Sequence, residues 1–370
     1  MNRQYEGVFI ESGGFFPVIA KHNNCVYVFC RINAGHLGRF GQIKVLISNN
    51  GLDWYPQGII QKENSDVRNP SVYIFPDGEI LVSAYKYNVY NKKGIASPSE
   101  MSSPENIELL LFSSKDGGKT WQEEYNAFDA IYAEIGKASP YGQMLQYNQK
   151  VLMPVYNKKG AFLLSSLDRG KNWEIFCRIA KNTLEPSVAV TRDNELLAVL
   201  RAGIHSPDGT VSFISRYANN KWTTPVNITE AMQHPANLLT LANGQILLTY
   251  SDRNPERQRI LAKISSDSGR TWSQPVQITK TFQNCDFGYP SSIEIEEDVV
   301  LTVFYANPVK KPYFYFGNPD YYETFFANGY YCLYSISEVR SCTSMVGNAN
   351  GDSHDLCQGK FEFSQKFFSP

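Results

Sequence analysis

The chain has 370 residues, 14% of them aromatic, and it contains 26 glycines and 19 prolines. This mixture favours short strands separated by turns, and the length allows two average domains or one large all-β domain. The chain has 35 lysine and arginine residues and 36 aspartate and glutamate residues, so its net charge is −1. This balance excludes a long-range electric field that would attract nucleic acid or an anionic membrane surface. The longest apolar runs are of strand length, so we expect no membrane span.

The N-terminal stretch MNRQYEGVFIESGG lacks the basic start, the apolar run and the small-residue cleavage site of a secretory signal. It therefore predicts a cytoplasmic chain as written, and a secreted or periplasmic one if a signal has been removed. The seven cysteines are scattered without a C-x-x-C pair, and the five histidines do not cluster with them. We therefore expect reduced thiols, no metal site and no cofactor.

A proline followed by a predicted strand recurs six times, and six copies predict six repeated units. In chain order the segments read FFPVIA, RNPSVYIF, ASPYGQML, LEPSVAV, QHPANLLTL and GYPSSIEI, with prolines at Pro17, Pro70, Pro140, Pro186, Pro235 and Pro290. Each of these strands is followed by a turn, clearest as FPDGEI and LANGQI, and then by a second apolar run.

A second repeat, out of phase with the first, has the frame S-x-D-x-G-x-[TN]-W. Clear copies begin at Ser114, Ser166 and Ser265, and weaker copies begin at Ser48 and Ser215. All five tryptophans of the protein end these copies, at Trp54, Trp121, Trp173, Trp222 and Trp272. An aspartate with a glycine two residues later is typical of a hairpin turn, and the tryptophan is expected to pack between neighbouring sheets. We therefore interpret Asp116, Asp168 and Asp267 as turn residues, not as catalytic carboxylates.

The two repeats together describe a four-stranded antiparallel unit, so the sequence predicts an all-β, six-bladed β-propeller over residues 1–340. The N-terminal strand is expected to complete the last blade. The segment Tyr87–Asn106 is the largest insertion and is predicted to be a loop that overhangs a site. Residues 341–370 break the blade pattern, and we assign them no structure.

The innermost strands of a propeller border its central channel, so equivalent positions in all six repeats should form a ring at one mouth. Before the prolines stand Phe16, Asn69, Ser139, Glu185, His234 and Tyr289. At the ends of the next strands stand Arg31, Lys86, Tyr156, Arg201, Arg253 and Tyr305. Arginine binds carboxylates through paired N–H groups and keeps its charge, so three arginines in this ring predict a ligand with a carboxylate.

These repeats resemble the sialidase superfamily, in which the S-x-D turn is known as the Asp box. CRIN at Arg31 resembles the motif with the first arginine of that family's substrate-carboxylate triad, with Asn33 in place of a proline. EPSVAVTRDNELLAVLR resembles the segment with a glutamate and the second arginine, matching Glu185 and Arg201. YPSSIEI resembles the segment with the nucleophilic tyrosine, matching Tyr289.

The third arginine of the triad is expected in SDRNPERQR, where placement at a strand end favours Arg253 over Arg257 and Arg259. In the family mechanism the glutamate takes the phenolic proton and the tyrosine attacks the anomeric carbon. An aspartate on the loop after the first arginine then serves as acid/base.

The loop that should carry the acid/base aspartate, Asn33–Gln42, contains no aspartate or glutamate. His36 lies near the expected position, and histidine transfers protons near neutral pH. Asp66, beside Arg68 at the mouth of the next blade, is the other candidate. The choice between His36 and Asp66 is open at this point.

The resemblance implies a retaining exo-glycosidase that removes a terminal acidic sugar, sialic acid or a relative, from a glycan. Its substrate-binding residues would be Arg31, Arg201, Arg253, Arg68 and His234. Two alternatives stand beside it: a hydrolase or lyase that acts on a different glycoside through histidine and tyrosine, and a carbohydrate-binding propeller without catalysis. The oligomeric state is left open.

Overall fold

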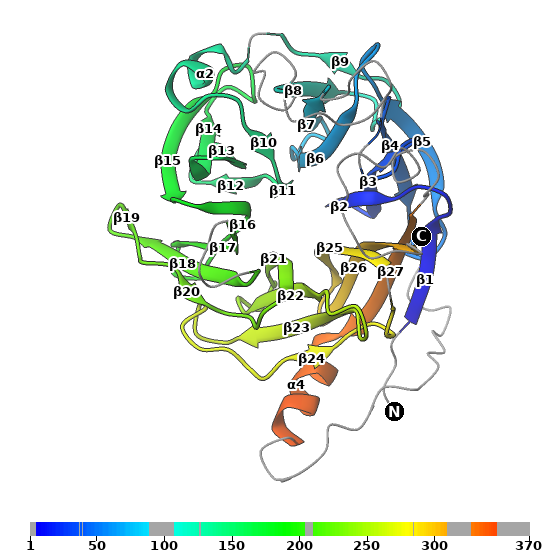
Figure 1. Cartoon of the computed structure of the whole chain (residues 1–370), viewed down its shortest axis with the longest axis vertical. Coiled ribbons are helices and arrows are strands. Elements are labelled where there is room, and N and C mark those ends of the chain that lie inside the picture. Colours follow the sequence, from blue (N-terminus) through cyan, green and yellow to red (C-terminus); the bar gives the residue numbers. More distant parts are fainter. Residues whose placement is uncertain are drawn as a thin grey trace.

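Six β-sheets stand in a ring around a central axis (Figure 1). The computed structural model describes residues 5–36, 38, 40–88, 107–125, 127–203, 210–283, 285–308 and 327–345. In five of the six sheets the strand that carries the repeated proline lies innermost, and in the sheet of β6 (Val67–Ile74) the short strand β11 (Gly142–Gln143) lies inside it (Figure 1). The predicted six-bladed β-propeller is therefore confirmed.

Blades 1 to 3 come from the first half of the chain. Blade 1 contains β2 (Phe15–His22), β3 (Cys25–Ile32), β4 (Gln42–Ser48) and β5 (Tyr55–Ile60). Blade 2 contains β6 (Val67–Ile74), β7 (Ile80–Tyr87), β8 (Ile107–Ser114), β9 (Gln122–Glu123) and β11 (Gly142–Gln143). Blade 3 contains β10 (Ser139–Pro140), β12 (Leu145–Tyr147), β13 (Lys150–Asn157), β14 (Gly160–Ser166) and β15 (Glu174–Ala180).

Blades 4 to 6 complete the ring. Blade 4 contains β16 (Thr183–Val190), β17 (Leu196–Ala202), β18 (Ser212–Ala218), β19 (Lys221–Trp222) and β20 (Val226–Asn227). Blade 5 contains β21 (Gln233–Thr240), β22 (Ile246–Asp252), β23 (Arg259–Ser265) and β24 (Val276–Gln277). Blade 6 contains β25 (Cys285–Glu296), β26 (Val299–Pro308), β27 (Asn328–Ser335) and β1 (Tyr5–Ile10). The described part of the chain also contains the helices α2 (Asp129–Ile135) and α4 (Ile336–Met345).

The two ends of the described chain meet in blade 6. Strand β1 pairs antiparallel with β27, with Tyr5 opposite Leu333, so the N-terminal strand completes the last blade as predicted. Helix α4 follows β27 directly, and residues 346–370 of the C-terminal tail lie outside the described residues. Residues 89–106 of the predicted overhanging loop also lie outside them. In the described part of the chain, no helix is both long and apolar enough to cross a membrane.

The ring departs from purely four-stranded antiparallel blades at β11, which pairs in parallel with β6. This pairing carries Gln143 from blade 3 to the centre of the ring. Its side-chain amide donates to the carbonyls of Ile19 and Ser292 at 2.9 and 3.0 Å, and its oxygen accepts from Asn237 Nδ2 at 3.1 Å. Because these three residues belong to blades 1, 6 and 5, Gln143 closes the middle of the ring at this level.

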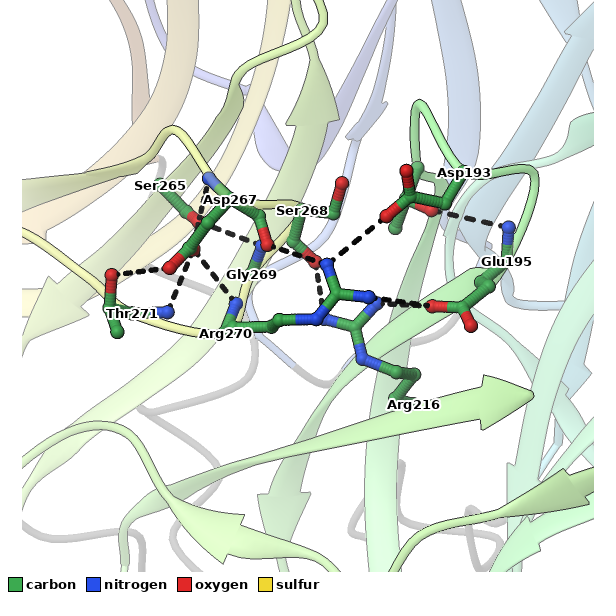
Figure 2. A network of polar contacts seen from close by, with 10 residues as sticks. Asp193, Glu195, Arg216, Ser265, Asp267, Ser268, Gly269, Arg270 and Thr271 are labelled. Atoms are coloured by element: carbon green, nitrogen blue, oxygen red, sulfur yellow. Dashed lines mark hydrogen bonds and ion pairs between the residues drawn. The ribbon is translucent and has the colours of Figure 1, made fainter.

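The Asp-box aspartates hold turns at the ends of the third strands. Asp267 accepts hydrogen bonds from Ser265 Oγ at 2.7 Å and from the backbone and hydroxyl of Thr271 at 2.8 and 2.6 Å (Figure 2). Arg270 of the same turn reaches Asp193 in blade 4 at 3.1 Å (Figure 2). These bonds fix the hairpin and join neighbouring blades, so the aspartate is a scaffold residue.

The Asp-box tryptophans pack against the preceding blade, as the sequence predicts. Trp121 of blade 2 makes an edge contact with Phe29 of blade 1, with ring centroids 6.2 Å apart. Trp173 of blade 3 packs with Phe128 and with Leu81 of blade 2 in one core cluster. The tryptophan spacing therefore reflects the burial of one large side chain between each of these pairs of sheets.

Candidate active site

The residue before the repeated proline has a left-handed backbone in four of the six inner strands. The φ angle is 51° at Phe16 and Asn69, 46° at Glu185 and 58° at Tyr289. The strand register shifts at each of these residues, which marks a β-bulge. Such a bulge re-aims a side chain, and positive φ is costly for a non-glycine residue, most of all before proline. Backbone strain therefore falls on the predicted ring of residues.

Tyr289 of blade 6 and Glu185 of blade 4 meet in this ring. Tyr289 Oη donates a hydrogen bond to Glu185 Oε1 at 2.6 Å, and the same oxygen accepts from Arg201 Nη1 at 3.1 Å. Tyr289 is 9% and Glu185 4% exposed. Burial and the charge of Glu185 raise the pKa of Tyr289 well above its ordinary value, so the phenol keeps its proton at neutral pH. Glu185 is placed to accept that proton when a reaction demands it.

His36 of the blade 1 loop contacts Asp286, which lies at the start of β25. His36 Nδ1 and Asp286 Oδ2 are 2.7 Å apart. The other carboxylate oxygen of Asp286 accepts from Tyr305 Oη at 3.0 Å and from Arg253 Nη2 at 3.2 Å. Burial lowers the pKa of His36 below its ordinary value, against the opposing effect of the Asp286 carboxylate. His36 is therefore neutral at neutral pH.

Arg31 and Asp66 form a pair that is closed to solvent. Asp66 Oδ1 accepts from Arg31 Nε at 3.0 Å and from Nη2 at 2.7 Å, and both side chains are 0% exposed. The remaining Arg31 N–H groups donate to the carbonyls of Gly35 and Gly38. The structure therefore holds Arg31 in a closed pair with Asp66, without direct access to solvent. That Arg31 binds the substrate carboxylate stays a prediction, and so does the role of Asp66 as the alternative acid/base to His36.

Arg68 of β6 packs against two aromatic rings near the mouth of the channel. Its guanidinium lies over the rings of Phe16 at 4.9 Å and Tyr87 at 5.3 Å, and the residue is 6% exposed. Its charge acts on His36 together with that of Arg253. Two guanidinium groups thus face the same imidazole.

Among the described residues of the site, the formal charges leave one positive charge in excess. Arg68, Arg201 and Arg253 carry three positive charges, whereas Glu185 and Asp286 carry two negative ones. Arg31 and Asp66 cancel each other. The mouth of the channel therefore suits a ligand with a single negative charge.

His234, predicted to bind substrate, is buried at the same mouth. It is 5% exposed, and its Nδ1 has no hydrogen-bond partner among the described residues. Burial, followed by the positive charges of Arg201 and Arg253, lowers the pKa of His234 to about 2. His234 therefore presents a neutral, unpaired nitrogen beside the two arginines.

Replacing His234 with glutamine should make the fold less sensitive to acid. Between pH 6.5 and about 2 the unfolded chain binds a proton at His234 that the folded chain does not. The free energy of unfolding therefore falls by about 1.4 kcal/mol for each pH unit below 6.5, or about 3 kcal/mol at pH 4.5. Urea unfolding at pH 7.5 and 4.5 measures this loss, which His234→Gln should reduce. An equal loss of stability in variant and wild type would contradict the lowered pKa of His234.

A cavity lies at the inner ends of the blades beneath these residues. Its walls include Phe16, Asn69, Tyr141, Asn237 and Tyr289. Glu185 Oε2 and Arg201 Nε are buried without a hydrogen-bond partner among the described residues. Neither of these two residues lines the cavity, but buried polar atoms without a partner are typical of a site that completes its bonds with a ligand. A search of the described residues finds no group of three or more His, Cys, Asp or Glu side chains that could hold a metal ion.

The sequence matches the family model of the BNR repeat-like domain over residues 28–301. The chain belongs to this family. A sialidase of Bacteroides fragilis (strain YCH46) is 23% identical over 244 residues, which cover 60% of this chain and 43% of the sialidase. The chain thus matches less than half the length of this curated relative.

Two solved structures show the fold of this BNR repeat-like domain. A protein of unknown function from Dyadobacter fermentans DSM 18053 superposes with a TM-score of 0.68 at 20% identity, covering 89% of this chain and 98% of that one. The Hadza microbial sialidase Hz136 superposes with a TM-score of 0.63 at 16% identity, covering 89% of this chain and 66% of that one. At these identities the likeness shows a sialidase-type propeller and no more.

Sequence reasoning about this BNR repeat-like domain missed Asp286. It stands four residues before Pro290, as Asp66 stands four residues before Pro70. Each aspartate pairs with an arginine of the preceding blade, Asp66 with Arg31 and Asp286 with Arg253. Alignment of the repeats at this position was the signal that could have found it.

Proposed function

We propose that the chain is a retaining exo-glycosidase that removes a terminal acidic sugar, with Tyr289 as nucleophile and Glu185 as its base. The observation that carries the proposal is the 2.6 Å hydrogen bond from Tyr289 Oη to Glu185 Oε1 in a buried pocket. A neutral phenol paired with a carboxylate attacks an anionic sugar without the repulsion that a carboxylate nucleophile would meet. The similarity to the Bacteroides fragilis sialidase supports the same reaction class.

The proposed reaction has two steps. In the first, the phenolic proton of Tyr289 passes to Glu185 as the tyrosine oxygen bonds to the anomeric carbon. The bond from that carbon to the leaving oxygen breaks, and the leaving oxygen takes a proton from His36, which carries this proton at a pH below its lowered pKa. In the second, His36 takes a proton from water as the water oxygen bonds to the anomeric carbon. The bond to Tyr289 breaks, and its oxygen regains the proton from Glu185. Protons and electrons balance over the cycle.

The arginines support a sugar with one carboxylate. The positive charges of Arg201 and Arg253 act on the hydroxyl of Tyr289. With Arg68 they leave one positive charge in excess over the two site carboxylates. The closure of the ring centre by Gln143 supports exo action, because a chain could not thread through the middle at that level.

A panel of aryl glycosides tests the proposed function. The panel should contain the aryl glycosides of sialic acid, of uronic acids and of neutral hexoses, with released aglycone as the readout. We expect release only from acidic sugars, with proton NMR showing that the first product keeps the anomeric configuration of the substrate. Release from neutral sugars alone, or release with inversion, would overturn the proposal.

Elimination is a second candidate, favoured by the lowered pKa of His36 and its contact with Asp286. A neutral imidazole is a base at neutral pH. It would take the proton on the carbon next to a uronate carboxylate, a carbon–carbon double bond would form, and the β carbon–oxygen bond would break. The leaving oxygen would receive a proton from a tyrosine such as Tyr289 or Tyr305, and the product would absorb ultraviolet light.

The pH profile separates these two reactions. Burial lowers the pKa of His36 below 6.5, with the charges of Arg68 and Arg253 lowering it further. In hydrolysis His36 must be protonated, so kcat/KM should fall as pH rises through this pKa. In elimination His36 must be neutral, so kcat/KM should rise through the same pKa. A profile that stays flat over the whole pH range below 6.5 in which the protein is folded would contradict both roles of His36.

A further inference from the structure

The Asp286 carboxylate gathers three donors from three different parts of the ring. Its Oδ2 lies 2.7 Å from His36 Nδ1, and its Oδ1 lies 3.0 Å from Tyr305 Oη and 3.2 Å from Arg253 Nη2. Asp286 is 5% exposed. Although burial opposes ionisation, the contacts with His36, Arg253 and Tyr305 lower the pKa of Asp286, so the carboxylate is charged.

An ionised carboxylate only accepts hydrogen bonds, so the nitrogen of His36 that contacts it must carry a proton. In the neutral imidazole Nδ1 then holds the single proton, and Nε2 keeps its lone pair. The contact with Asp286 thereby defines the tautomer of His36.

The His36 ring is also held from other elements. Phe16 and Phe15 of β2 meet the imidazole edge-on, with ring centroids 5.0 and 6.4 Å away. The charged and titratable groups that face it are Arg68 of β6, Arg253 after β22, Asp286 of β25 and Tyr305 of β26. Asp286 is the carboxylate among these described groups, and at 2.7 Å it lies closer to Nδ1 than the Tyr305 hydroxyl at 3.5 Å, so it is the main acceptor for Nδ1–H.

We propose that Asp286 is a positioning residue that holds His36 with its proton on Nδ1 and leaves Nε2 to exchange protons with the substrate. The inference rests on the proposed function, because it names the residue through which that site's acid/base group is oriented. Carboxylate–histidine pairs fix the ring and raise its basicity in other enzymes. Arg253 and Tyr305 then serve to keep the carboxylate ionised and in place.

An asparagine at position 286 should reverse the tautomer. The amide oxygen would remain with the two donors Arg253 and Tyr305, which places the amide NH₂ against His36. Nδ1 would then accept a hydrogen bond, and the proton would move to Nε2. In serine proteases the same carboxylate-to-amide change lowers kcat by about 10⁴-fold through the wrong tautomer.

Nitrogen-15 NMR of the imidazoles tests the inference without any substrate. The His36 signal is assigned as the one lost in His36→Gln. We expect the wild-type protein to show His36 protonated at Nδ1 and unprotonated at Nε2 at pH 7.5, and Asp286→Asn to show the reverse. A wild-type signal from Nε2–H, or from a rapid mixture of both tautomers, would overturn the inference even if the variant did not fold.

Kinetics on the acidic aryl glycoside found in the panel provide the second arm. Asp286→Asn should lower kcat by roughly 10²- to 10⁴-fold with little change in KM. The same substitution in a His36→Gln background should cost nothing further. Tyr305→Phe, which leaves the carboxylate and Arg253 in place, should cost less than Asp286→Asn. Wild-type kcat in Asp286→Asn, or additive losses in the double variant, would overturn the inference.

The two arms separate this inference from the proposed function. If NMR shows the Nδ1–H tautomer and no glycoside in the panel is turned over, the proposed function fails while the orientation of His36 by Asp286 stands. If acidic glycosides are turned over and the tautomer is Nε2–H, the function stands and the role of Asp286 fails.

Discussion

Replacing Tyr289 with phenylalanine should lower kcat by roughly 10³-fold or more while leaving KM within a few-fold of wild type. The substitution keeps the ring in the aromatic cluster of the mouth but removes the oxygen that bonds to the anomeric carbon. Glu185→Gln should cause a similar loss, because an amide keeps the shape of the side chain and cannot take the phenolic proton. Steady-state release of aglycone from an acidic aryl glycoside measures both variants.

Tyr147→Phe is the matched control for these substitutions. It removes a hydroxyl that donates to the carbonyl of Asn194 at 3.3 Å, away from the mouth of the channel. Its kcat should equal that of the wild type. If Tyr289→Phe and Glu185→Gln also kept wild-type turnover on that substrate, the assignment of the nucleophile and its base would be wrong.

His36→Gln and Asp66→Asn should have opposite effects on activity and stability. Loss of the imidazole removes the proposed acid/base and should lower kcat by roughly 10²- to 10⁴-fold, with little change in the free energy of unfolding. Asp66→Asn leaves the guanidinium of Arg31 buried without its counter-charge. We expect that variant to lose about 3 to 5 kcal/mol in urea unfolding and to keep its kcat per folded molecule.

The pair of variants decides between the two acid/base candidates. Low kcat in a stable, folded Asp66→Asn protein, with normal kcat in His36→Gln, would show that the carboxylate transfers the proton. Such a result would require the Arg31–Asp66 pair to open during the reaction. The complete burial of both side chains predicts that it stays closed.

The fold could be predicted from the sequence because two independent repeats describe the same blade. The tryptophans mark the turns that fill the space between sheets, and the prolines mark the inner strands. Because the six blades are arranged around one axis, residues at equivalent positions of the repeats lie around one ring. For that reason Glu185 and Tyr289, which are 104 residues apart, could be placed in one site before their hydrogen bond was known.

Local burial could not be predicted in the same way. Arg31 and Arg253 occupy equivalent strand ends, and each pairs with an aspartate of the next blade. The carbonyls of Gly35 and Gly38 fold over Arg31 and seal it, whereas Arg253 remains 12% exposed. The path of an irregular loop decides this difference, and no repeat specifies that path.

The partner of His36 escaped prediction for a related reason. His36 and Asp286 are 250 residues apart, and the loop that carries His36 lies outside both sequence repeats. The repeats predict that Asp286 lies at the mouth of the channel. They do not predict that the loop after β3 brings His36 into contact with it. The tautomer that we propose for His36 rests on this contact.

Covalent trapping tests the central claim most directly. An acidic sugar with a fluorine beside the anomeric carbon and a good leaving group should form the glycosyl–enzyme intermediate quickly and release it slowly. Peptide mass mapping should then find the sugar attached to Tyr289 in the wild type and no labelled peptide in Tyr289→Phe. Attachment to a carboxylate such as Glu185, or labelling that persists in Tyr289→Phe, would contradict the account.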